Sequence, residues 1–182
     1  MTSITIAILG GTGHEGSGLG LRWAKAGHTV LIGSRVAAKA EAAAAELNAR
    51  LGQPLVRGLE NIAAAQAAEI VVLTVPYAAH HSTLEAVRAA VQGKVFVDVT
   101  VPLVPPKVSR VQLPAGGSAS QEAQALLGPD VKVVTAFQNI SAEHLKDPDH
   151  PIDCDVLVCG DDKEAKALVI RLAAAAGMQA WD

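Results

Sequence analysis

The chain has 182 residues, a length that suits one domain. Half of the residues are hydrophobic, only 3% are aromatic, and the formal net charge is −3 with both signs interspersed. Without a basic stripe no nucleic-acid partner is expected, and no apolar run reaches the roughly 20 residues that span a bilayer. The N-terminus carries no export signal, and Cys154 and Cys159 are predicted to point to opposite faces of one strand. We therefore expect a cytoplasmic protein without a disulfide and without membrane contact.

The first half of the chain alternates strands and helices. In chain order the predicted elements are a strand at 4–9, a helix at 16–26 ended by Gly27, a strand at 29–35, an Ala-rich helix at 36–51, a weaker strand near 54–59, a short helix at 60–67 and a strand at 69–76.

The second half continues this alternation. It is predicted to contain a helix at 78–91, a strand at 94–101, an irregular proline-rich crossing at 101–108, a helix at 118–128 with a capping box of Ser118 and Gln121, strands at 130–138 and 155–160, a helix at 163–176 capped by Asp162, and a strand at 178–181. Runs of Val and Ile separated by helices predict an α/β fold with a doubly wound, mainly parallel sheet. We expect about eight strands, with helices on both faces.

Gly11, Gly13 and Gly16 follow the first strand with the spacing G-x-G-x-x-G. This spacing predicts a dinucleotide site where it opens a helix inside a strand–helix–strand unit. Gly11 would allow the tight turn, Gly13 would leave room for the pyrophosphate, and Gly16 would let the helix pack closely on the strand. The helix N-terminus would then offer free N–H groups to the phosphates. A glycine turn without a ligand is the alternative.

Three neighbours of this motif carry further expectations. Gly18 and Gly20 lie inside the helix, where glycine is costly, so we expect close packing there against the sheet or the cofactor. Glu15 would repel a phosphate, so we expect its side chain to point away from the site.

The end of the second strand indicates which dinucleotide binds. A site for NAD usually places Asp or Glu there to hold the ribose hydroxyls, whereas this chain has Ser34 and Arg35. Arg35 can contact a 2′-phosphate, and Lys39 lies one helical turn further on the same face. The alternative is a solvated pair of surface cations. We expect NADP(H) as the cofactor.

Five stretches of the sequence carry a resemblance to a known family: "IAILGGTGHEGSGLGLRWAKAGHTVLIGSR", "VVLTVP", "VDVTVPL", "TAFQNISAEHL" and "DVLVCGDDKEAK". They closely resemble the NADPH-dependent reductases of the deazaflavin coenzyme F420. They are also similar to the cytosolic domain of the six-transmembrane metalloreductases. The resemblance covers nearly the whole chain and implies an NADP-binding Rossmann domain over residues 1–182. Members of that family continue into C-terminal helices, which this sequence, ending at Asp182, is expected to lack. A homodimer is conceivable on the same grounds.

The resemblance also implies site residues. Thr12, Gly13, His14 and Glu15 would line the pyrophosphate, and Ser34, Arg35 and Lys39 would hold the 2′-phosphate. Val75 and Val101 would lie along the nicotinamide half, with Ala142 at its end, and Gln138 and Ile140 would face the acceptor. Gln138 stands where well-studied members can carry a histidine.

No nucleophile–base pair emerges from the sequence, and we expect no catalytic side chain. His80 and His81 begin a predicted helix and are expected to be solvated, although either could reach the site, whereas Asp98 is expected to be buried with a hydrogen-bonding role. Asp161 and Asp162 are interpreted as helix caps. A metal site is not expected in the polar connection that contains His144, Asp147, Asp149, His150 and Asp153.

The predicted function is hydride transfer between NADP(H) and a deazaflavin or flavin-like acceptor, which needs positioning more than proton transfer. Two alternatives remain open at this point. One is an NADP(H)-sensing module without turnover, and the other is an NADPH reductase of another small acceptor.

Overall fold

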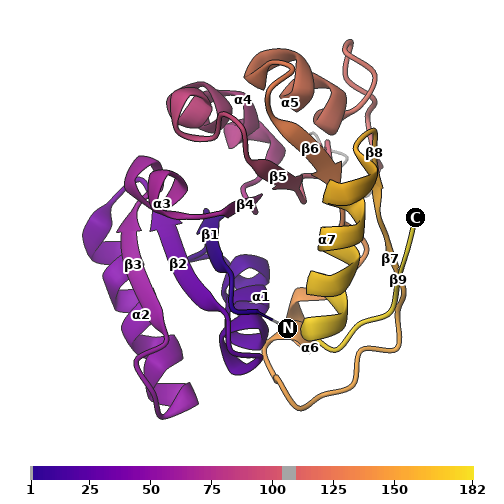
Figure 1. The fold of residues 1–182 in the computed structure, drawn as a ribbon. Helices are drawn as coiled ribbons and strands as arrows, with labels where there is room; N and C mark the ends of the chain where they lie inside the picture. The colour runs from indigo at the N-terminus through magenta and orange to yellow at the C-terminus, as the bar shows by residue number, and fades with distance from the viewer. Residues whose placement is uncertain (1, 104–109) are drawn as a thin grey trace.

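A computed structural model describes residues 2–103 and 110–182 of the chain (Figure 1). Its elements, in chain order, are β1 (Thr5–Leu9), α1 (His14–Lys25), β2 (Thr29–Ser34), α2 (Ala37–Leu51), β3 (Val56–Glu60), α3 (Asn61–Ala67), β4 (Ile70–Leu73), α4 (Tyr77–Val87), the 3₁₀ turn η1 (Arg88–Ala90), β5 (Val95–Asp98), α5 (Ala119–Leu127), β6 (Lys132–Thr135), α6 (Ala142–Leu145), β7 (Val156–Leu157), β8 (Cys159–Gly160), α7 (Lys163–Ala175) and β9 (Ala180–Trp181).

Seven strands form one sheet in the order β3-β2-β1-β4-β5-β6-β8. All neighbours are parallel except β6 and β8, which are antiparallel. The direction of winding reverses between β1 and β4, and Leu9 is in register with both Gly33 and Leu73. The carboxyl ends of the central strands therefore meet at one edge, where open α/β sheets bind ligands. The prediction of a doubly wound, mainly parallel α/β sheet is confirmed.

The single strand predicted at 155–160 was wrong, because the chain changes sheet within it. β7 pairs in parallel with β9 in a separate two-stranded sheet, and β8 pairs with β6 at the edge of the main sheet. Each half has a different partner, since Val158 N–H donates to Trp181 O over 2.8 Å while Cys159 is in register with Thr135. The expectation that Cys154 and Cys159 share a strand was therefore also wrong, and both thiols are free and exposed.

The helices differ from the predictions by more than one residue in three places. α1 begins at His14, two residues earlier than predicted, the helix expected to reach residue 91 gives way to η1 after Val87, and the short helix α6 was not predicted. Ser118 and Asp162 are confirmed as N-caps, because Ser118 accepts a hydrogen bond from Gln121 N–H and Asp162 accepts one from Ala165 N–H. The return bond of the capping box, from Ser118 N–H to the Gln121 side chain, stays a prediction, and Asp161 precedes the N-cap of α7. The predicted proline-rich crossing at 101–108 lies outside the described residues from position 104 onward.

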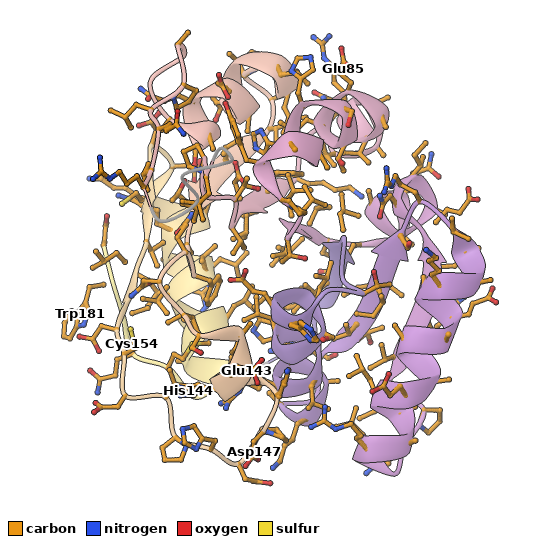
Figure 2. The ribbon with its side chains drawn as sticks, turned by 180° about the vertical axis from the view of Figure 1, so that it is seen from behind. Glu85, Glu143, His144, Asp147, Cys154 and Trp181 are labelled. Carbon is orange, nitrogen blue, oxygen red and sulfur yellow. The ribbon has the colours of Figure 1, made fainter. Side chains whose placement is uncertain are left out.

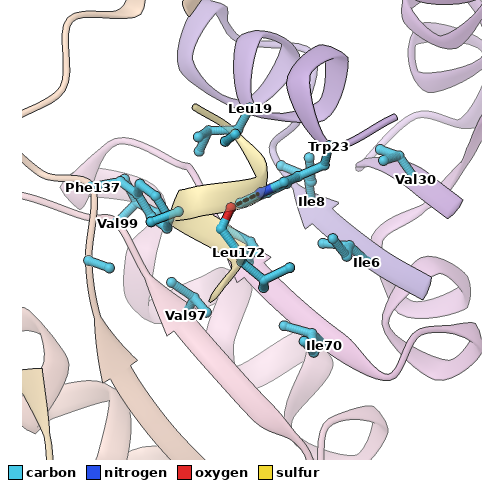
Figure 3. Close-up of a cluster of buried hydrophobic side chains, with 14 of the residues drawn as sticks. Ile6, Ile8, Leu19, Trp23, Val30, Ile70, Val97, Val99, Phe137 and Leu172 are labelled. Atoms are coloured by element: carbon cyan, nitrogen blue, oxygen red, sulfur yellow. Dashed lines mark hydrogen bonds between the residues drawn. The ribbon is translucent and has the colours of Figure 1, made fainter. Parts of the chain in front are cut away.

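Helices cover both faces of the sheet, as the sequence predicts (Figure 1). One apolar cluster joins the sheet to α1, α2 and α7, and the other joins it to α3, α4 and α5. In the first cluster Trp23 packs edge-on against Phe137, and its indole N–H donates to Leu172 O over 2.8 Å (Figure 3). Within the described residues no helix is both long enough and apolar enough to cross a membrane.

Arg22 is the one arginine buried within the described part of the chain, at 5% exposure on α1. Its guanidinium donates to the carbonyl oxygens of Ala176, His144, Asp147 and His150 over 2.6–3.0 Å, with a longer contact of 3.5 Å to that of Leu145. Desolvation lowers the pKa of the guanidinium, an effect partly opposed by nearby carboxylates. The Arg22 side chain thus connects α1 to α6, to the polar connection after α6 and to Ala176 at the end of α7.

Replacing Arg22 by Met should lower the free energy of unfolding by about 2–4 kcal/mol, because several buried carbonyls lose their donor at once. Urea denaturation measures this. Lys25→Ala, on the same helix but half exposed in an ion pair with Asp149, should change stability by less than about 0.5 kcal/mol. Equal effects of the two variants would contradict the assigned role of Arg22.

Candidate dinucleotide site

A cavity of about 620 Å³ opens at the carboxyl ends of β1, β2, β4 and β5. The residues that line it are Gly10, Thr12, Gly13, His14, Glu15, Ser34, Arg35, Lys39, Asn61, Thr74, Val75, Pro76, Ala79, Thr83, Val99, Thr100, Val101, Leu103 and Gln138. This is the volume range of small-molecule and cofactor sites. It lies at the switch point of the sheet, between β1 and β4.

The glycine turn between β1 and α1 is held by close contacts. The positive φ falls on Gly10, at +74°, and not on Gly11. A Cβ at Gly11 would lie 2.7 Å from Ile8 O, and one at Gly16 would lie 2.5 Å from the Thr74 hydroxyl and 2.7 Å from Gly11 Cα. Gly16 thus lets α1 approach the sheet as predicted.

Gly13 is exposed, and a Cβ there would meet only Gly10 O at 3.5 Å, so the backbone is open on its cavity side. Gly13 is also the N-cap of α1. The N–H groups of the first helical turn have no partner within the helix and carry its positive dipole end. The turn therefore presents donors to the cavity.

Gly18 and Gly20 also make the close contacts that were expected, in different places. A Cβ at Gly20 would lie 3.1–3.4 Å from Ile8, Ile32 and Val30 of the sheet, whereas one at Gly18 would lie 2.5 Å from Leu145 Cβ on α6. Helix α1 is thus pressed between the sheet and α6.

A cationic corner lies at the end of β2. Ser34 is buried, and its hydroxyl accepts a hydrogen bond from Val36 N–H over 3.3 Å. Arg35 and Lys39 are exposed, and neither takes part in any ion pair found between described residues. Both therefore have their charges available to an anion. Their convergence on one cavity is what the sequence predicted.

Comparison with known proteins assigns the family. Residues 5–102 match the family described as NADP oxidoreductase, coenzyme F420-dependent. The F420-dependent NADP reductase of Methanocaldococcus jannaschii is 44% identical over 175 residues, which cover 92% of this chain and 78% of that protein. The chain belongs to the coenzyme F420-dependent NADP oxidoreductases. The predicted family and the predicted NADP(H)-dependent oxidoreductase class are thereby confirmed.

Two more distant likenesses agree with this membership. The rat metalloreductase STEAP3 is 29% identical over 177 residues, covering 97% of this chain and 33% of that protein. A solved structure of a hypothetical protein from Sinorhizobium meliloti superposes with a TM-score of 0.79 at 24% identity and covers all of this chain and 84% of that one. The structural likeness supports the Rossmann-type fold of this family member.

Of the site residues predicted for this oxidoreductase, most line the cavity and four do not. Gly11 and Gly16 shape the turn from beneath, Ile140 is buried in the core, and Ala142 begins α6. Their predicted contacts with the cofactor or acceptor stay predictions. Nine lining residues had not been predicted as site residues, namely Gly10, Asn61, Thr74, Pro76, Ala79, Thr83, Val99, Thr100 and Leu103. Asn61, Ala79 and Thr83 belong to no motif, whereas Thr74 and Thr100 lie in stretches that resemble the family but had been given no contact.

His80 was expected to be solvated, and that expectation was wrong. Its ring is 1% exposed, and Nε2 lies 2.8 Å from an oxygen of Asp98, which is fully buried. The other Asp98 oxygen accepts from Thr100 N–H over 3.0 Å, and Asp98 O accepts from the Gln138 amide over 2.8 Å. Asp98 therefore has the buried hydrogen-bonding role predicted for it, and it joins α4, the end of β5 and Gln138. His81 is exposed, as expected.

Helix α6 and the polar connection after it lie at the periphery, where Figure 2 labels Glu143 and His144 of α6 and Asp147 of the connection. The rings of His144 and His150 lie 4.9 Å apart, centroid to centroid. No group of three or more potential ligands for a metal ion occurs among the described residues.

Glu15 is half buried among the residues that line the cavity. Desolvation raises the pKa of its carboxyl from 4.5 to about 7. The carboxyl is thus less withdrawn from the site than the sequence suggested, and it gains a proton at an ordinary pH. A neutral carboxyl beside a phosphate avoids the repulsion that Glu15 was expected to cause.

The raised pKa gives a pH-dependent stability. Between pH 4.5 and about 7 the folded protein holds a proton on Glu15 that the unfolded chain releases, so stability falls as the pH rises through this window. Glu15→Gln cannot ionise and should gain about 1–2 kcal/mol relative to the wild type between about pH 5 and pH 8, less than full linkage because the side chain is partly exposed. Urea midpoints across this range measure the difference. The same change at the exposed Glu46 should leave the pH profile unaltered, and a Glu15→Gln profile parallel to the wild type would refute the assignment.

Proposed function

We propose that this protein transfers a hydride between NADP(H) and coenzyme F420, with the dinucleotide lying along the cavity from Arg35 to Val101. The observation that carries the proposal is the uneven distribution of ionisable groups among the described residues that line the cavity. Those groups belong to His14 and Glu15 at the start of α1, to Arg35 just after β2 and to Lys39 in the first turn of α2. This placement supports phosphate binding at the end of the cavity that these residues line.

None of the described residues that line the opposite end of the cavity is ionisable. They are Thr74, Val75, Pro76, Ala79, Thr83, Val99, Thr100, Val101, Leu103 and Gln138. NADPH supplies the hydride when bound. The chain's own contribution at this end is to hold the ring and the acceptor in contact and to limit water, which can supply a large part of the barrier reduction. Val75 and Val101 offer apolar surface, and Gln138 is held in place by its bond to Asp98 O.

Neutral hydrogen-bonding groups supply what polarity this end has. The Thr100 hydroxyl lies 3.4 Å from Val75 O, and the Thr74 hydroxyl donates to Leu9 O over 3.1 Å. Transfer of a hydride needs no proton from the wall, so a wall whose described residues at this end are not ionisable suits this reaction class. The expected lack of the family's C-terminal helices, a possible homodimer and a cytoplasmic location all stay predictions.

The reaction is tested by binding and then by turnover. NADPH and NADH are titrated by fluorescence, and F420, FMN or FAD is then added while oxidation of the nicotinamide is followed. Oxidation with F420 alone supports the proposal. Oxidation with FMN or FAD instead of F420 would contradict the choice of acceptor. Tight NADPH binding without turnover by any acceptor would favour the NADP(H)-sensing module. A parallel assay with small carbonyl and imine compounds tests the remaining alternative, and turnover only there would favour an NADPH reductase of another small acceptor.

The 2′-phosphate corner gives a separate prediction. Arg35→Ala should lower the preference for NADPH over NADH by about 10–100-fold, because a charge-assisted hydrogen bond to the phosphate is lost. Dissociation constants for both dinucleotides measure the effect. Arg57→Ala, which removes an exposed arginine of β3 outside the cavity, is the matched control. An unchanged preference in Arg35→Ala would show that the cofactor is selected elsewhere.

A further inference from the structure

Asn61 stands out among the residues that line the cavity. It is the first residue of α3, directly after β3, and only 8% of its surface is exposed. Its side-chain oxygen is buried and has no hydrogen-bond partner among the residues that the structure describes. Buried polar groups are nearly always paired, so an unpaired one that borders a ligand cavity indicates a missing donor.

The position of this oxygen relates it to one part of the cavity. A Cβ placed on Gly33 would lie 2.8 Å from the Asn61 oxygen, so the amide packs against the backbone at the carboxyl end of strand β2. The next residue is Ser34, where the cationic corner begins. Asn61 therefore borders the place where a ribose bearing a 2′-phosphate would lie.

The chemistry of that place requires a neutral acceptor. Where a dinucleotide site has a carboxylate after β2, it accepts hydrogen bonds from both ribose hydroxyls. A 2′-phosphate removes one of these hydroxyls and would repel a carboxylate, but the remaining hydroxyl still needs an acceptor. Glu60, in register with Ser34, is exposed and does not line the cavity. An amide oxygen meets the need without charge.

We propose that the side-chain oxygen of Asn61 accepts a hydrogen bond from the free 3′-hydroxyl of the adenosine ribose of NADP(H). Rotation about the last side-chain bond of Asn61 exchanges the amide oxygen and nitrogen, so the acceptor can turn toward the cavity. This assignment rests on the proposed NADP(H) site. It adds a residue that recognises the sugar to the three that recognise its phosphate.

The test pairs a change in the protein with a change in the ligand. Adenosine 2′,5′-bisphosphate and its 3′-deoxy analogue are titrated calorimetrically into the full chain and into Asn61→Ala. The wild type should bind the hydroxylated nucleotide about three- to tenfold more tightly, the size of one neutral hydrogen bond. Asn61→Ala should bind both nucleotides equally, at about the wild-type affinity for the deoxy analogue.

Two further variants separate recognition from folding. Gln66→Ala, an exposed change on the same helix, should retain the wild-type discrimination. Asn61→Asp should weaken the bisphosphate more than tenfold and 5′-ADP much less, because a carboxylate would face the 2′-phosphate.

The outcomes are distinct. If the wild type does not discriminate between the two nucleotides, or if Asn61→Ala weakens both by the same factor, the proposed hydrogen bond is wrong while the NADP(H) site stands. If the wild type binds neither nucleotide, the proposed site itself fails, and the assignment of Asn61 fails with it.

Discussion

The close approach of helix α1 to the sheet is the constraint on which the rest of the structure depends. Gly16 allows it, because any side chain there would collide with the Thr74 hydroxyl and with the backbone of Gly11. Only a helix seated this deeply directs its N-terminus at the space between β1 and β4. The backbone N–H groups, the turn at Gly10 and the open side of Gly13 all take their positions from this contact. The charged end of the cavity follows from a steric requirement at one residue.

The opposite side of α1 is held by Arg22, and this contact orders the second half of the chain. Strands β7 and β9 form a sheet of their own and do not pair with the main sheet. The polar connection before β7 and the end of α7 therefore depend on side-chain contacts for their position. A guanidinium with several donors can satisfy carbonyls from separate segments at once, which an apolar side chain cannot do. Glycine on one face and arginine on the other thus make α1 the element that joins both halves.

Those features of the site that depend on neighbours in sequence could be predicted, and those that depend on distant partners could not. The G-x-G-x-x-G spacing and the Ser34, Arg35 and Lys39 set are local, and the structure brings them to one cavity. The hydrogen bonds of Arg22 reach backbone carbonyls more than 120 residues away in the sequence. Every residue has a backbone carbonyl, so no sequence pattern marks the ones that Arg22 contacts. The burial of His80 on α4 likewise follows from its contact with Asp98 at the end of β5.

The split of the strand at 155–160 could not be predicted for a related reason. The apolar run from Val156 to Val158 favours extended backbone on both sides of the break, and the presence of β6 and β9 as two separate partners decides where the chain changes sheet. Sequence patterns report the conformation of a segment, but they do not report which edge it pairs with. The fold class was therefore predictable, and the arrangement at this edge was not.

The separation of charge along the cavity has a functional consequence. Cations and helix N–H groups at one end of the cavity would stabilise the bound phosphates of the dinucleotide. This binding energy would arise far from the nicotinamide carbon that exchanges the hydride. The other end has no fixed charge among its described lining residues, so it does not favour either the oxidised or the reduced ring through a nearby ion. A hydride can then pass in either direction with the balance set by the two reactants, which suits a protein that equilibrates two carriers. The buried pair of His80 and Asp98 keeps its ionisable groups behind that wall, where they organise Thr100 and Gln138 without facing the reactants.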